Sequence, residues 1–295
     1  MSSTGDCLGI CFADHQLFYA VNGQSGGARL QHIGCIDFNF PVLTAVSGSD
    51  SENSDSLKKS LCRLQDKYTC DSVRMLTPAV LECWSTFPRL VYETADERED
   101  HLSIVMEGLP RSDMESTWHE LSNQDYRLLT VRNRHLTENY RKLTLDFSQS
   151  DFVSEFELGS DWQYHTGMKG SYLTVNCQPD HLAVSSYLLG KLRGATFIRF
   201  ESIDDLPYLW TCYARNLAWM NGIHEQIYVY GYCGLEIMEV LSSFLGETGQ
   251  VILMNNLEAM NVKADESTYG FKLESSFPAI MLSLNLPGQK VTTAE

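Results

Sequence analysis

The sequence has little positive charge and no long hydrophobic run. Lysine and arginine number 22 against 38 aspartates and glutamates, so the formal net charge is −16. Nucleic-acid and anionic-membrane surfaces depend on clustered lysine and arginine, and this balance argues against both kinds of partner. No apolar stretch approaches the roughly 18 residues of a membrane span, and the first residues lack the pattern of a signal peptide. We therefore expect a cytoplasmic protein without direct membrane insertion.

Several catalytic and cofactor motifs are also missing. The chain has no Gly-x-x-x-x-Gly-Lys-Ser/Thr loop, no Gly-x-Gly-x-x-Gly fingerprint after a strand, no His-Glu-x-x-His and no Cys-x-x-Cys. Its nine cysteines are odd in number and irregularly spaced, which is not typical of a disulfide framework. These absences exclude the common phosphate-loop, dinucleotide and zinc-protease signatures.

A hairpin-like stretch occurs twice in the chain. Ile10–Ala20 and Asn176–Ser186 align without a gap at an offset of 166 residues and share the pattern Cys-x-x-Asp-His. Each reads as a strand, a polar turn and a second strand. Self-similarity at this spacing predicts two related lobes rather than a solenoid, whose repeats span roughly 20 to 50 residues. A chain of 295 residues is also long enough for two domains.

The hydrophobic pattern after each hairpin alternates between strands and helices. In the first half it predicts a strand at 28–38, a polar loop at 47–56, a helix at 57–68 and a strand at 72–76. In the second half it predicts strands at 195–200, 226–230 and 250–254, with helices at 206–220 and 235–245. This order predicts an α/β protein in which mixed sheets carry flanking helices.

One stretch of the first half has no counterpart in the second. It contains a predicted helix at 98–106, strands at 117–121 and 126–131, and a further helix from Asn133 to Leu143. We interpret it as a small α+β insertion at about 79–131. The predicted organisation is a first lobe at 1–165 that carries the insertion, a second lobe at 166–287 and a flexible tail at 288–295.

Two hairpin-led lobes with one insertion in the first resemble the actin-like ATPase superfamily. Within it, the order of elements is most similar to the bacterial branch that includes the type IV pilus assembly protein PilM and the cell-division protein FtsA. The resemblance is topological and spans about Leu8 to Leu286. It implies that each hairpin carries an aspartate and a glycine-containing turn, whose backbone N–H groups bind phosphate while the carboxylate organises Mg²⁺.

Both hairpins of this sequence depart from that pattern. Cys11 stands where the first aspartate is expected, and the turn at 13–16 has no glycine. In the second hairpin Asn176 or Cys177 occupies the corresponding place. Pro179 lies in the second turn, where it removes a backbone donor. Phosphate binding by these turns is therefore not expected.

The polar residues of the turns allow two interpretations. Asp14 and Asp180 could act as displaced metal ligands, but aspartate also favours turns through its own backbone hydrogen bonds. His15 and His181 follow them, without a third ligand at a defined spacing. We therefore predict no metal site.

A third segment, Ile227–Glu236, resembles the strand, glycine turn and helix that pack against adenosine in the superfamily. Gly231 and Gly234 keep part of that pattern, although any short strand-to-helix turn favours glycine. The candidate residues of a residual nucleotide pocket are therefore Asp14, Asn176, Asp180, Gly231 and Gly234.

Cys233 offers a different chemistry, because it lies between a strand and a helix as the nucleophile of a hydrolase elbow does. His224 lies upstream, but Leu235 occupies the place of the elbow's second small residue. A buried or turn cysteine is the alternative interpretation. Residues 5–9 also match the sequence pattern of the elbow, but they precede a strand of the first hairpin and do not join a strand to a helix.

Together these observations predict a non-catalytic, actin-like scaffold or adaptor that has lost phosphate binding and needs no cofactor. The resemblance implies a protein partner, such as a peptide of a membrane or secretion component, and directs attention to the insertion surface at 79–130. One alternative is an ATP-binding phosphotransferase or ATPase with a divergent site between the lobes, using Asp14, Asp180 and the Gly231 turn, for which ATP with Mg²⁺ would be the disfavoured cofactor. The other is a cysteine hydrolase at Cys233.

Overall fold

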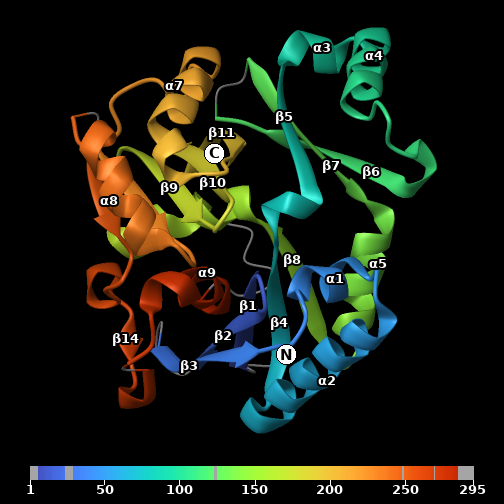
Figure 1. The fold of residues 1–295 in the computed structure, drawn as a ribbon, viewed down its shortest axis with the longest axis vertical. Helices are drawn as coiled ribbons and strands as arrows, with labels where there is room; N and C mark the ends of the chain where they lie inside the picture. The colour runs from blue at the N-terminus through green and yellow to red at the C-terminus, as the bar shows by residue number, and fades with distance from the viewer. Residues whose placement is uncertain (1–5, 24–28, 123–124, 248, 269, 285–295) are drawn as a thin grey trace. The chain divides into compact units, whose positions relative to one another are not determined.

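The computed structural model contains three β-sheets with flanking helices (Figure 1). It describes residues 6–23, 29–122, 125–247, 249–268 and 270–284. The predicted tail at 288–295 lies outside these residues. Contacts group the chain into two compact units, of which the first is Met1–Pro78, His135–Ser154 and Asn255–Glu295, and the second is Ala79–Arg134 and Glu155–Met254. This grouping differs from the predicted single boundary near residue 165.

The first unit is built on a six-stranded mixed sheet in the order β14-β3-β2-β1-β4-β8. Its strands are β1 (Asp6–Ala13), β2 (Gln16–Gly23), β3 (Arg29–Asp37), β4 (Cys70–Thr77), β8 (Gln149–Ser154) and β14 (Lys263–Ala264). β1, β2 and β3 pair antiparallel, whereas β4 pairs parallel with β1 and β8 parallel with β4. The predicted hairpin, third strand and mixed sheet are therefore confirmed.

Four α-helices belong to this unit within the described ranges: α1 (Val42–Ser47), α2 (Ser51–Tyr68), α5 (Arg134–Leu143) and α9 (Leu273–Leu284). α2 begins at Ser51 and not at Leu57, so the prediction of a polar loop up to 56 is wrong. The Asp50 side chain accepts hydrogen bonds from the backbone N–H groups of Glu52 and Asn53, and this cap lets the polar segment start the helix. None of the described helices is both long and apolar enough to cross a membrane.

The helix α9, which the sequence did not predict, lies directly on β1. A Cβ atom at Gly9 would stand 2.0 Å from the Ala279 carbonyl oxygen and 2.5 Å from the Ser283 backbone nitrogen. Most of α9 is buried, and Pro278 lies inside it. The chain thus returns to the first unit after residue 254, although the prediction placed 255–287 in the second lobe.

The second unit contains a five-stranded sheet in the order β11-β10-β9-β12-β13. Its elements are β9 (Ser171–Cys177), β10 (His181–Leu188), β11 (Lys191–Arg199), β12 (Gln226–Tyr230), β13 (Gln250–Leu253), α7 (Leu206–Asn216) and α8 (Gly234–Leu245). Apolar residues of β9, β10 and β12 pack with those of α7 and α8 in one buried core. α7 ends at Asn216, before the predicted end at 220.

The insertion forms a three-stranded antiparallel sheet in the order β5-β7-β6. It consists of β5 (Glu82–Pro88), α3 (Arg89–Glu93), α4 (Ala95–Val105), β6 (Met114–Glu120) and β7 (Tyr126–Asn133), with α3 and α4 next to one end of the sheet (Figure 1). Leu128 of this sheet shares a buried cluster with Phe156 and Ala195. The Ser122 backbone N–H also donates to the Leu192 carbonyl oxygen, at 2.6 Å. The insertion therefore packs against the sheet of the second unit.

Candidate functional site

The turn of the first hairpin consists of Asp14 and His15. Asp14 adopts a left-handed backbone conformation, with a φ of 46°. Its carbonyl oxygen accepts a hydrogen bond from Val42 N–H, and the His15 carbonyl oxygen accepts one from Phe38 N–H, both at 2.8 Å. The Asp14 carboxylate is exposed and lies 3.5 Å from His15 Nε2. These two backbone hydrogen bonds thus hold the turn against other segments of the first unit.

The place of the expected first carboxylate is occupied by a buried thiol. Cys11 is 3% exposed, and its Sγ lies 3.9 Å from the Ser275 carbonyl oxygen of α9. The thiol is therefore directed into the core of the first unit. A thiol is not the hard oxygen ligand that Mg²⁺ prefers, so Cys11 cannot replace a carboxylate that organises this ion.

The second hairpin turns at Pro179 and Asp180. The Gln178 backbone N–H donates to the His181 carbonyl oxygen at 2.9 Å, and proline has no N–H to offer. The exposed Asp180 carboxylate lies 2.7 Å from Nδ1 of His181. Of the residues 178–180, only Asp180 has an N–H that the turn does not use. Asp180 has a structural partner here, and its predicted role at a nucleotide stays a prediction.

Asn176 and Gly231 lie next to each other at the ends of parallel strands. Asn176 of β9 pairs with the last residue of β12, and Gly231 follows with a φ of 108°. A Cβ atom at Gly231 would lie 2.3 Å from Asn176 Oδ1 and 2.5 Å from the Cys177 carbonyl oxygen. Gly234 donates its N–H to the Gly231 carbonyl oxygen at 3.1 Å and begins α8. The lack of space for a Cβ atom is by itself sufficient to require glycine at position 231.

Sequence reasoning missed a buried carboxyl group beside Asn176. Glu155 is 4% exposed, and its Oε1 accepts from Ala79 N–H at 3.4 Å. Burial raises the pKa of Glu155 to about 8, against the lowering effect of the Ala79 amide and the Asn176 side chain. Glu155 Oε2 and Asn176 Nδ2 are both buried, and the Asn176 side chain lies close enough to Glu155 to act on its carboxyl group. A single glutamate after a strand carries no local pattern that would have revealed this burial.

Cys233 does not have the environment of an activated nucleophile. Burial, and secondarily the Glu236 carboxylate, raises the pKa of its thiol. Its backbone N–H donates to the Cys177 carbonyl oxygen at 3.2 Å, which ties the turn to β9. Because nucleophilic cysteines need a lowered pKa, the structure favours a turn cysteine. The other elbow-like stretch begins at Gly5, which lies outside the described residues.

No group of three or more histidine, cysteine, aspartate or glutamate side chains within the described ranges could hold a metal ion. In the first unit His15 lies beside Asp14, and in the second His181 lies beside Asp180, so each turn has one such pair. A pair alone does not complete the ligand set of a typical protein metal site.

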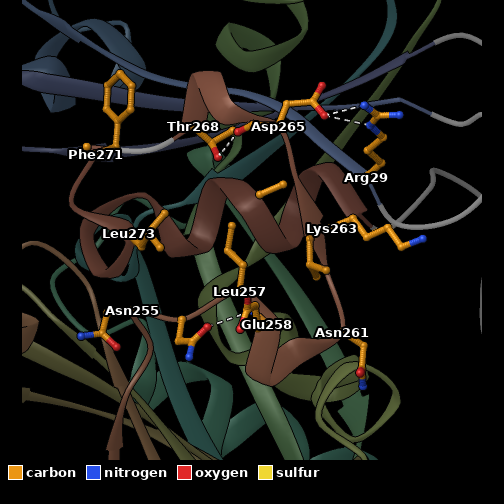
Figure 2. Close-up of a pocket in the computed structure, with 14 residues that line it drawn as sticks. Arg29, Asn255, Leu257, Glu258, Asn261, Lys263, Asp265, Thr268, Phe271 and Leu273 are labelled. Atoms are coloured by element: carbon orange, nitrogen blue, oxygen red, sulfur yellow. Dashed lines mark hydrogen bonds and ion pairs between the residues drawn. The ribbon is translucent and has the colours of Figure 1, made fainter.

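An open pocket of about 1060 Å³ in the first unit contains none of the predicted site residues. Figure 2 shows it between the segment 255–273 and Arg29 of β3. Arg29 forms an ion pair with Asp265 at 2.7 Å, and the hydroxyl of Thr268 donates to the Asp265 carbonyl oxygen at 2.7 Å. Asn256 likewise caps the backbone N–H of Glu258. Arg29, Thr268 and Asn256 thus bond to other residues of the pocket lining.

The comparisons with known proteins identify the fold. No family model and no curated protein matches the sequence. PilM in the PilM–PilN type IV pilus biogenesis complex is similar with a TM-score of 0.63 and 11% identity, over 94% of this chain and 97% of that chain.

Two further solved structures are similar at low sequence identity. The cytoplasmic domain of EpsL, an inner membrane component of the Vibrio cholerae type II secretion system, has a TM-score of 0.50 and 8% identity over 94% of each chain. A protein of unknown function with an actin-like ATPase fold, from Bacteroides thetaiotaomicron, has a TM-score of 0.49 and 12% identity over 86% of this chain and 92% of that chain. The similarity to PilM confirms the predicted fold, and the chain has an actin-like fold.

Proposed function

We propose that this protein is an actin-like scaffold or adaptor that does not bind a nucleotide polyphosphate. The observation that carries the proposal is the second hairpin turn, where the Gln178 N–H is used inside the turn and Pro179 has none. A phosphate cradle needs several converging backbone N–H groups, and this turn has only that of Asp180 to offer. The cradle of the second unit is therefore incomplete.

The charges at both turns support the same conclusion. Cys11 and Asn176 carry no carboxylate and are buried where the superfamily pattern calls for acids that organise Mg²⁺. The remaining acids, Asp14 and Asp180, are exposed beside histidines. Without a bound cation they would repel phosphate, as would the net charge of −16. Neither turn thus combines donors and a buried carboxylate.

A protein partner fits this proposal. PilM is found in a complex with PilN, and EpsL is a component of a secretion system. By analogy we propose that this chain also binds a protein of a larger assembly. The insertion surface at 79–130 stays the predicted place for that contact.

Isothermal titration of the purified protein with Mg-ATP tests the proposal. We expect no Mg²⁺-dependent heat of binding, because the second hairpin turn lacks the backbone donors of a phosphate cradle. The double variant Asn176→Asp with Pro179→Gly is the matched comparison, since it restores an acid and a backbone donor. Micromolar, Mg²⁺-dependent binding by the unaltered protein would contradict the adaptor proposal.

A nucleotide-binding enzyme is the second candidate, and the pair of Glu155 and Asn176 favours it. Burial keeps a carboxyl group with a raised pKa beside an amide, and such groups often cluster at functional sites. If Mg-ATP raises the melting temperature of the protein, Glu155→Gln should abolish the rise and the exposed Glu201→Gln should not. An equal response of both variants would remove this candidate.

A further inference from the structure

An extra residue in β11 places an arginine beside the insertion. Ser186 pairs with Gly194 and Tyr187 pairs with Leu192, so Arg193 has no counterpart on β10. A bulge of this kind turns a side chain away from the regular alternation of the strand. Arg193 here lines a groove of about 250 Å³ within the second unit.

The groove lies between the inserted sheet and the body of the second unit. Thr86 of β5 and Tyr126 of β7 line it from the insertion, and the segment 216–219, which begins at the last residue of α7, lines it from the body. Leu217 and Trp219 are also packed against the core of the five-stranded sheet, which holds this side in place. Tyr126 is 43% exposed, so an aromatic surface remains open to a partner.

The indole of Trp219 leaves a hydrogen-bond donor unused. It lies against Gly194, where a Cβ atom would stand 2.4 Å from Nε1. Nε1 is buried and has no acceptor among the residues that the structure describes. Because the indole packs against Gly194, the neighbour of Arg193, its N–H resonance should report a ligand that binds in the groove.

The groove is also positively charged in a strongly acidic protein. It has no acidic lining residue, and Arg193 forms no ion pair with any residue of the described ranges. Nearby, burial and then the charge of Arg193 lower the pKa of His224 to about 4.

We propose that this groove binds a peptide segment of the partner protein in which an acidic residue adjoins an aromatic or aliphatic one. The carboxylate binds the Arg193 guanidinium, and the apolar side chain packs against Tyr126 and Trp219. Ligand pockets for small molecules are typically about 300 to 1,000 Å³, so this smaller groove suits one or two side chains of a longer partner. Arginine and aromatic residues are also the usual anchors of protein interfaces. The inference rests on the proposed adaptor function.

The probe for the test is the synthetic peptide acetyl-Gly-Phe-Glu-Gly-amide, followed by the indole N–H resonances of the ¹⁵N-labelled full chain. The chain has five tryptophans, and Trp219→Phe identifies the resonance of interest by its loss. We expect this resonance to shift on titration and to report the dissociation constant. The peptide with Gln in place of Glu should bind at least about tenfold more weakly, since a charge-assisted hydrogen bond is lost.

Two arginine variants of the same strand provide the matched control. Arg193→Gln should weaken binding of the acidic peptide at least about tenfold, and Arg199→Gln, at an exposed position of β11, should leave it unchanged. An unmoved Trp219 resonance in excess peptide, or equal binding by both variants, would overturn the inference. A Mg-ATP titration of the same sample tests the adaptor proposal separately, because binding of Mg-ATP would refute that proposal. If neither the peptide nor Mg-ATP binds, only the peptide-binding role of the groove is refuted.

Discussion

In the first hairpin Asp14 and His15 form the turn, whereas in the second Pro179 and Asp180 form it and His181 begins β10. The shared letters Cys-x-x-Asp-His are thus displaced by one residue relative to the turn. Proline explains the displacement, because its fixed φ suits the first central position of a turn. By position in the hairpin, the counterpart of Cys11 is Asn176.

The displacement changes the environment of each histidine. The His15 side chain is 44% exposed in its turn, whereas that of His181 is 7% exposed and its ring lies 4.6 Å from the ring of Phe197. Successive residues of a strand face opposite sides, so a shift of one residue exchanges a solvent position for a core position. Identical residues at the two turns therefore have different structural environments.

The largest expected difference between the hairpins lies on β1, which α9 covers at Gly9. We expect Gly9→Ala to destabilise the protein by about 3 kcal/mol or more, because the new methyl group would overlap the α9 backbone. Urea unfolding measures the change. Gly222→Ala is the control, since its Cβ would meet nothing within 4 Å, and equal stability of the two variants would contradict the close packing of α9.

The second hairpin differs from the first by the buried carboxyl of Glu155 beside Asn176. Because the pKa of Glu155 is about 8 in the folded state and 4.5 in the reference state, the folded protein holds the proton between these values and the unfolded chain does not. Stability should then fall with rising pH, by about 1.4 kcal/mol per unit, or about 3 kcal/mol from about pH 5.5 to about pH 7.5.

Glu155→Gln should remove this part of the pH dependence. Urea unfolding at both pH values gives the difference between wild type and variant, in which other titrating groups cancel. The exposed Glu201→Gln is the matched control. A pH profile of Glu155→Gln that is parallel to wild type would show that the carboxyl titrates normally.

The two histidines provide a third test of the comparison. We expect His181→Ala to cost about 2 kcal/mol, since it removes a buried ring that contacts Phe197. His15→Ala should change stability by less than about 0.5 kcal/mol, because that ring is largely exposed. Thermal or urea unfolding of both variants checks the ratio, and equal costs would mean that the two turns are equivalent after all.

The smallest expected effects concern the two turn aspartates. Asp180→Asn should cost no more than about 0.5 kcal/mol, because the carboxylate paired with His181 is exposed and screened by water. Asp14→Asn should be nearly neutral, since asparagine also tolerates the left-handed conformation. A loss above about 2 kcal/mol for either variant, measured by urea unfolding, would reveal a role that the observed contacts do not explain.

Local patterns predicted much of the secondary structure. Both hairpins and β12 lie where alternation placed them, and α8 begins one residue before its predicted start. The order of these elements was sufficient to predict the actin-like fold. By contrast α9 contains Pro278 and two serines near its start, which weaken a helical pattern, and only burial against β1 stabilises it.

The candidate site was predictable only in part. Gly231 and Asn176 were found from their sequence pattern, and the structure places them side by side. Glu155 and Arg193 were not predicted. The burial of Glu155 results from tertiary packing, and the position of Arg193 results from a bulge in β11. Neither the burial nor the bulge is determined by the neighbouring residues in the sequence alone.

The sequence by itself determined the alternating strands and helices, the absence of glycine from both hairpin turns and the proline that removes a donor. These are local properties, because they depend on side-chain periodicity and on the backbone freedom of single residues. The tertiary structure alone decided the one-residue displacement of the second turn, the contact of α9 with β1 and the groove that presents Arg193. These features depend on which distant segments pack together, and that choice minimises exposed apolar surface over the whole chain.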